Sequence, residues 1–254
     1  MSSELEVLLL ATDCESTRAI YHRLLRSHRV IQVVIEQPIS RRRLLRRRAE
    51  KLGRRVVAGQ LLFQLLVQRP LGWASRARLE EIAREHELNL SPVDASHTIH
   101  VESVNDEHTI ELVRRLRPKV AVLSGTRIVS KATLAAIGAP TLNMHAGITP
   151  RYRGVHGGYW ALAEGRADLV GTTVHLVDPG IDTGSVLEQV RFAPTARDNF
   201  ATLPLLHVAH GLPALERQVQ RALEGALTPR EPLDPTSALR YHPTLFQYLR
   251  YGVR

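Results

Sequence analysis

Short runs of consecutive apolar residues alternate with amphipathic stretches along the first part of the chain. Residues 5–11 and 30–35 are two such runs, and the stretch between them, residues 16–25, has the periodicity of a helix that Asp13 or Ser16 would cap. Short apolar runs are typical of strands buried on both faces of a sheet. The strand–helix–strand order predicts an α/β fold with a doubly wound, mostly parallel sheet.

The same pattern continues through most of the chain. Further strands are predicted at residues 98–104, 118–123, 139–145 and 173–177, the last with a hairpin partner at 184–192. Helices are predicted from Asn105 or Asp106 to about residue 116, after Ser130 at 131–137, at 157–165, and from Asp198 or Asn199 to about residue 223.

Residues 39–88 are predicted to form a helical insertion. A basic run with six arginines occupies residues 41–48, and a strongly apolar run at 56–67 follows it, with Pro70 and Gly72 expected to end the second helix. Two interpretations stay open. The segment 41–67 could contact an anionic membrane from its surface. The interpretation we favour is a solvated basic face beside an apolar helix that is buried within the chain or in a homo-oligomer.

Composition places the chain among ordinary globular proteins. It has 254 residues, of which 44% are hydrophobic and 23% charged, enough for one catalytic domain at 1–226 with a tail at 227–254. Its single cysteine, Cys14, excludes an intrachain disulfide. The acidic start does not resemble a secretory signal, so we expect a cytoplasmic protein, with contact to the inner face of the membrane left open. The net charge of +9 suits anionic partners.

Three polar residues follow apolar runs in positions that suit catalysis. Asn143 and His145 lie at the exit of one predicted strand, and Asp182 lies in a glycine-rich turn after another. Ligands bind beyond the carboxyl ends of parallel strands, so Gly125, Asn143 and His145 should surround one crevice. An amide and an imidazolium can stabilise an oxyanion, and a carboxylate can help to move a proton. Each residue alone also has a structural interpretation, as a cap, a core histidine or a turn residue.

Three segments together resemble the folate-dependent formyltransferases. They are Leu-Asn-Met-His-Ala-Gly-Ile-Thr-Pro-Arg-Tyr-Arg-Gly at 142–154, Gly-Thr-Thr-Val-His-Leu-Val-Asp-Pro-Gly-Ile-Asp-Thr-Gly at 171–184, and Ser-Gly-Thr-Arg-Ile-Val-Ser at 124–130. This family includes glycinamide ribonucleotide, methionyl-tRNA and sugar N-formyltransferases. The resemblance is good over about residues 118–195 and topological before them. It implies a Rossmann-like fold and 10-formyltetrahydrofolate as the formyl donor. No metal site is expected, because His207 and His210 lie one helical turn apart without an evident third ligand.

The resemblance also assigns roles to individual residues. The catalytic trio falls on Asn143, His145 and Asp182, with Asp182 holding His145 protonated. Two groups are expected to bind the donor, first Gly125, Thr126, Arg127, Ile128 and Val129, and then Asp178, Gly180 and Ile181. The residues expected to bind the acceptor are Arg151, Arg153, His156 and Gly157.

The acceptor is expected to be a primary amine of small size. The turn at residues 12–16 lacks the glycines that would cradle a phosphate, which argues against glycinamide ribonucleotide, and the little chain after Ala226 argues against tRNA. We therefore expect an amino sugar or another small amine, phosphorylated or nucleotide-linked, and no nucleic acid partner. A hydrolase of the same donor, a glycinamide ribonucleotide formyltransferase and a non-catalytic binding module of the same fold remain alternatives.

Overall fold

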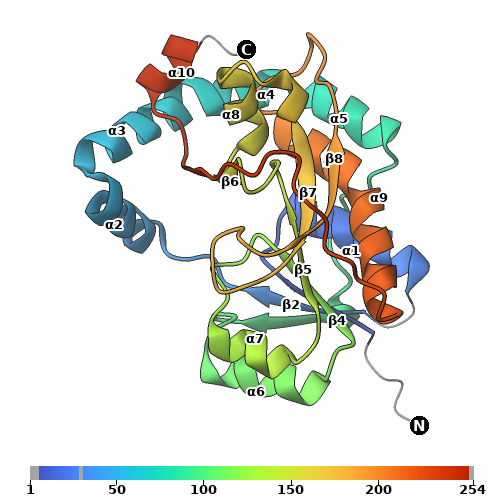
Figure 1. Ribbon diagram of the computed structural model, residues 1–254. Helices are drawn as coiled ribbons and strands as arrows, with labels where there is room; N and C mark the ends of the chain where they lie inside the picture. The colour runs from blue at the N-terminus through green and yellow to red at the C-terminus, as the bar shows by residue number, and fades with distance from the viewer. Residues whose placement is uncertain (1–5, 29–30, 252–254) are drawn as a thin grey trace.

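A seven-stranded sheet forms the centre of the protein in a computed structural model that describes residues 6–28 and 31–251 (Figure 1). The strand order is β3-β2-β1-β4-β5-β7-β8, with β1 to β5 parallel and with β7 and β8 antiparallel to their neighbours. The predicted mostly parallel, doubly wound sheet is therefore confirmed. Its strands are β1 (Val7–Ala11), β2 (Ile31–Glu36), β3 (Thr98–Val101), β4 (Val120–Ser124), β5 (Thr141–His145), β7 (Gly171–Leu176) and β8 (Val186–Arg191).

Helices cover both faces of this sheet because its central strands are apolar on both faces. In β1, Val7 and Leu9 belong to the core shared with α1 and α9, whereas Leu8 and Leu10 belong to the core shared with α6 and α7. Alternate residues of a strand point to opposite faces, so the run of leucines needs a helical layer on each side. These helices are α1 (Glu15–Ser27), α6 (Glu107–Leu116), α7 (Lys131–Ile137) and α9 (Leu203–Leu223).

The predicted insertion is helical, as expected, but it is not interrupted where the sequence indicated. The helix continues from α3 through a π-helical turn at Gln64–Gln68 into α4, past both Pro70 and Gly72. Pro70 lies in the first turn of α4, directly after the π-helical turn, where its missing N–H is tolerated. The helices of the insertion are α2 (Arg41–Leu52), α3 (Arg54–Phe63), α4 (Arg69–Ala74) and α5 (Arg76–Glu85).

Two predicted helix caps are confirmed and two are wrong. Asp106 accepts a hydrogen bond from Thr109 N, and Ser130 accepts one from Thr133 N. Helix α9 instead begins after Thr202. The Asp198 carboxylate forms an ion pair with Arg78 of α5 and accepts a hydrogen bond from Thr195 N, so it does not cap the helix. Helix α1 begins after Cys14, so neither of its two predicted caps is used.

The tail returns to the domain and packs on the insertion. The two-residue strand β9 (Leu239–Arg240) pairs with β6 (Arg153–Gly154), next to the start of α8 (Gly157–Ala163). Helix α10 (Leu245–Tyr251) packs on α3, where the rings of Tyr248 and Phe63 lie 5.0 Å apart. The division at residue 226 stays a prediction.

Candidate active site

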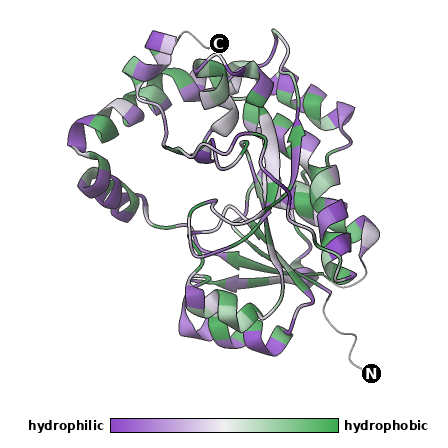
Figure 2. Ribbon diagram, viewed as in Figure 1, coloured by the Kyte–Doolittle hydropathy of each residue, from purple (hydrophilic) through white to green (hydrophobic). Residues whose placement is uncertain are grey.

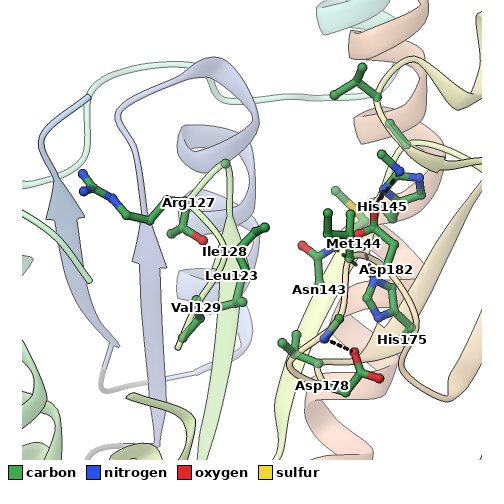
Figure 3. A pocket seen from close by; sticks show the side chains of 18 residues that line it. Leu123, Arg127, Ile128, Val129, Asn143, Met144, His145, His175, Asp178 and Asp182 are labelled. Carbon is green, nitrogen blue, oxygen red and sulfur yellow. Dashed lines mark hydrogen bonds and ion pairs between the residues drawn. The ribbon is translucent and has the colours of Figure 1, made fainter. Parts of the chain in front are cut away.

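The three predicted catalytic side chains converge at the carboxyl end of β5 (Figure 3). Asn143 and His145 are two residues apart in this strand and therefore share one face of it. The loop between β7 and β8 brings Asp182 to them with a left-handed backbone (φ +50°). Its Oδ2 lies 3.4 Å from His145 Nδ1, and its Oδ1 lies 3.5 Å from Asn143 Nδ2. An amide, an imidazole and a carboxylate thus meet at one point.

Asp182 is held as a carboxylate. Gly154 N donates a hydrogen bond of 2.9 Å to its Oδ2, and His175 Nε2 lies 3.6 Å from its Oδ1. Burial alone would raise the pKa of Asp182, but attraction to His145 when its ring is protonated, followed by the contacts with His175 and the Gly154 N–H, holds this pKa below its ordinary value. The side chain is therefore a hydrogen-bond acceptor and a negative charge at every pH near neutrality.

His145 is buried, and its two ring nitrogens face two acceptors. Its Nε2–H donates to the Tyr152 carbonyl at 2.7 Å, which leaves Nδ1 facing Asp182. Burial lowers the pKa of His145 even though Asp182 acts to raise it. The expected imidazolium is therefore wrong for this arrangement at neutral pH, because desolvation outweighs the carboxylate. A neutral imidazole with an open Nδ1 is a proton acceptor.

His175 belongs to the same hydrogen-bonded group as the trio. Asn143 and His175 are directly opposite in the β5–β7 register, and Asn143 Nδ2 donates to His175 Nε2 at 3.1 Å. The other ring nitrogen of His175 donates to the Leu176 carbonyl at 2.7 Å. These two bonds fix the tautomer of His175 and orient the carboxamide of Asn143.

Glu36, at the end of β2, positions the turn after β4 and was missed by the sequence analysis. Its buried carboxylate forms an ion pair with Arg127 Nε at 2.6 Å and also accepts a hydrogen bond from Arg127 N. Val104 N donates to the same carboxylate at 3.1 Å. The signal available in the sequence was an acidic residue at the exit of a parallel strand, where site residues collect.

A cavity of about 420 Å³ lies between the turn after β4, the end of β5 and the loop that carries Asp182. The trio and all eight residues expected to bind the donor line this cavity, namely Gly125, Thr126, Arg127, Ile128, Val129, Asp178, Gly180 and Ile181. Within residues 6–28 and 31–251, no group of three or more His, Cys, Asp or Glu side chains is placed to hold a metal ion.

The four residues expected to bind the acceptor lie behind this cavity and do not line it. Arg151 forms an ion pair with Glu164, and Arg153 donates to a carbonyl of the Asp182 loop. His156 contacts His242, with 2.9 Å between its Nε2 and the Nδ1 of His242, while Gly157 is buried. Their role in acceptor binding stays a prediction.

We expect Gly157→Ala to lower the free energy of unfolding by about 2 kcal/mol. A methyl group at Gly157 would lie 2.5 Å from Gly147 Cα and 2.7 Å from the Ala146 carbonyl oxygen, and backbone cannot move aside as a flexible side chain can. The urea midpoint of unfolding measures the effect. Gly72→Ala is the matched control, because open space surrounds Gly72 in α4 and alanine favours helices. Equal midpoints for the two variants would contradict the close backbone packing beside His145.

Three solved structures with similar architecture are formyltransferases by name. A sugar N-formyltransferase from a Shewanella species aligns with a TM-score of 0.59 at 11% identity, covering 92% of this chain and 76% of that one. An N-formyltransferase from Helicobacter canadensis aligns with a TM-score of 0.57 at 15% identity, covering 93% and 70%. Phosphoribosylglycinamide formyltransferase from Streptococcus pneumoniae aligns with a TM-score of 0.53 at 20% identity, covering 87% and 99%. At these identities the similarity establishes the fold.

Sequence comparison identifies the family. A methionyl-tRNA formyltransferase from Thermodesulfovibrio yellowstonii is 29% identical over 145 residues, which are 57% of this chain and 46% of that protein. One from Anaeromyxobacter dehalogenans is 34% identical over 129 residues, 50% of this chain and 41% of that protein. The chain spans about half the length of the curated relatives it matches. The formyl transferase family profile matches residues 13–204, so the chain belongs to the formyl transferase family.

Proposed function

We propose that this protein transfers a formyl group from 10-formyltetrahydrofolate to the nitrogen of a small primary amine. The observation that carries the proposal is the convergence of Asn143, His145 and Asp182 at one wall of a cavity whose other wall is the turn after β4. An acyl-transfer site needs a donor for the developing oxyanion and an acceptor for the amine proton beside the same carbon. The trio supplies both.

The cavity suits the folate donor. A flat ring would fit between the turn at Gly125 to Val129 and the loop at Asp178 to Ile181, since both segments line the cavity. Gly125 has a left-handed backbone (φ +68°), and a Cβ there would lie 2.7 Å from Thr12 Oγ1, so a larger residue would distort the turn. When bound, the folate supplies the formyl carbon, and the turn fixes its distance from β5.

His145 and Asp182 would take up the proton that the amine loses. A primary amine attacks only in its neutral form, so the ammonium must release a proton within the site. Neutral His145 presents Nδ1 toward Asp182, and a proton held at Nδ1 would lie between the imidazole and the carboxylate. Asp182 stabilises the charged ring at that moment, and a water molecule can carry the proton from the amine. The bond between the formyl carbon and the folate nitrogen would then break, and that nitrogen would take the proton as tetrahydrofolate leaves.

Asn143 would donate to the oxyanion. One hydrogen of its Nδ2 is directed to His175, and the other has only the 3.5 Å contact with Asp182. This second contact is at the limit of a hydrogen bond, so replacing it with a hydrogen bond to a charged oxygen costs little free energy. His175 keeps the carboxamide oriented while the exchange takes place.

An amino sugar is the acceptor class we favour. The Helicobacter canadensis neighbour was solved with folinic acid and dTDP-3-aminofucose, and the Shewanella neighbour is a sugar N-formyltransferase. The curated relatives act on methionyl-tRNA by name, which keeps that acceptor as the principal alternative. A panel of amino-sugar nucleotides, glycinamide ribonucleotide and charged methionyl-tRNA, each mixed with protein and 10-formyltetrahydrofolate, tests the proposal through tetrahydrofolate release. Release that needs no amine would contradict it.

A further inference from the structure

Almost all of the excess positive charge of this protein comes from one segment. Residues 41–76 contain eleven Lys and Arg and a single Glu, a net charge of +10, whereas the whole chain carries +9. The other residues together therefore carry −1. In helix α2 no residue is buried, and its arginines Arg41, Arg42, Arg43 and Arg47 make no ion pair in the described part of the chain. Helix α2 is hydrophilic along most of its length (Figure 2).

The same segment exposes large apolar side chains. Leu62, Leu65, Leu66 and Trp73 are 48%, 54%, 56% and 70% exposed. Their spacing of three, four or seven residues along the continuous helix of α3, the π-helical turn and α4 places them along one stripe. The sequence favoured burial of the apolar run at 56–67 within the chain or in a homo-oligomer, and Leu62, Leu65 and Leu66 of this run are not buried within the chain.

Helix α10 extends the apolar stripe. It packs on α3 (Figure 1), and its Phe246 and Leu249 are 74% and 66% exposed. A shallow groove between α2 and α3 brings Leu45 and Leu61 together with Arg46 and Arg54. The exposed apolar side chains and the arginines of these four helices are defined here as the arm surface (α2, α3, α4 and α10).

We propose that the arm surface docks on an anionic phospholipid bilayer. Helices that lie in a membrane interface combine apolar side chains that enter the acyl boundary with arginines that contact lipid phosphates. Among the described residues no helix is both long and apolar enough to cross a bilayer, so the contact is peripheral. A two-fold contact with a second copy would press the same +10 segment against itself, which like charges oppose.

Docking in this way would bring the formyl-transfer cavity close to the lipid surface. A second cavity of about 240 Å³ lies between the arm and the body, and Arg48, Leu52 and Gln60 of the arm line it. It shares Val155 and Ile181 with the larger cavity beside the trio. The docking proposal does not depend on the proposed reaction, because binding to vesicles is measured without substrate.

Vesicle flotation tests the docking. Vesicles of phosphatidylcholine with about one quarter phosphatidylglycerol should carry the 254-residue protein to the top of a gradient in about 0.1 M NaCl, and pure phosphatidylcholine should carry far less. The triple variant Arg41→Gln, Arg42→Gln, Arg43→Gln should lower the partition coefficient about a hundredfold. Leu65→Ser with Leu66→Ser should also lower it, with little effect on folding because both side chains are exposed.

The control removes the same charge elsewhere. Arg114→Gln, Arg115→Gln and Lys131→Gln lie at exposed positions of α6 and α7, at the opposite end of the molecule from α10 (Figure 1), and should leave flotation unchanged. Equal losses in the two triple variants would overturn the proposal, since net charge alone would then explain binding. So would the absence of flotation with anionic vesicles. A dimer by light scattering that Leu65→Ser with Leu66→Ser dissociates would assign the surface to a second copy instead.

Discussion

Asp182→Asn is expected to lower the turnover number of formyl transfer by about a thousandfold. The carboxylate is the negative charge that faces Nδ1 of His145. Burial keeps that imidazole neutral, so the carboxylate is needed to stabilise the positive charge when the ring accepts a proton. Asparagine is nearly the same size and can still accept the hydrogen bond from Gly154 N. The loop should therefore keep its conformation while the proton loses its stabilising charge. Initial rates of tetrahydrofolate release at saturating donor and amine measure the effect.

Asp168→Asn is the matched control for this variant. Asp168 is exposed, pairs with Arg166 and does not line the cavity beside the trio, so its turnover number should stay within about twofold of the wild-type value. A wild-type turnover number for Asp182→Asn would mean that the side chain only holds its loop in place, through the hydrogen bond from Gly154 N, and takes no part in the proton transfer. A large loss in both variants would indicate that acidic side chains act through the stability of the protein.

We expect the free energy of unfolding to fall by several kcal/mol between about pH 7 and pH 5. Burial, followed by nearby positive groups, lowers the pKa of His156 and of His207 to about 3 and that of His242 to about 4. The unfolded chain binds these protons below its ordinary histidine pKa of about 6.5, whereas the folded protein does not. Stability is therefore complete above pH 6.5 and is lost as the pH falls, by about 2 kcal/mol for each histidine at pH 5.

Urea unfolding at several pH values tests this expectation, and one variant isolates a single histidine. His207 is buried, with its Nδ1 at 3.0 Å from Thr172 Oγ1 and its Nε2 without a hydrogen-bond partner. His207→Gln should reduce the loss of stability at pH 5 by about 2 kcal/mol, whatever its effect on stability at neutral pH. His108→Gln, at an exposed position of α6, should keep the wild-type dependence. Identical pH dependence of stability in the wild type, His207→Gln and His108→Gln would contradict the conclusion that buried neutral His207 contributes to it.

The sequence predicted the layers of the fold because its local signals agree with the tertiary structure. The apolar runs of β1 and β4 are buried on both faces, and the caps Asp106 and Ser130 are adjacent to the helices that they start. The meeting of Asn143, His145 and Asp182 was also predictable. Strand exits meet at one edge of a parallel sheet, and the glycine-rich turn after β7 returns to that edge.

What the sequence could not show depends on contacts between distant segments. His175 joins the trio only through the β5–β7 register, which pairs it with Asn143, and neither strand encodes that register alone. The neutral state of His145 follows from its burial in the tertiary structure. The resemblance to the formyltransferases implied a protonated His145 held by Asp182 instead. The exposure of Leu65 could not be predicted from a hydrophobic run, since such a run is equally compatible with a buried helix.

Transfer of a labelled formyl group tests the central claim most directly. Donor labelled with ¹³C in its formyl group is incubated with the protein and the amine that gives the fastest tetrahydrofolate release, and the products are followed by NMR. We predict a formamide signal on the amine nitrogen that appears with wild-type protein and is almost absent with Asp182→Asn. Label that appears as formate at the same rate with and without the amine, or a formamide signal that Asp182→Asn leaves intact, would contradict the account.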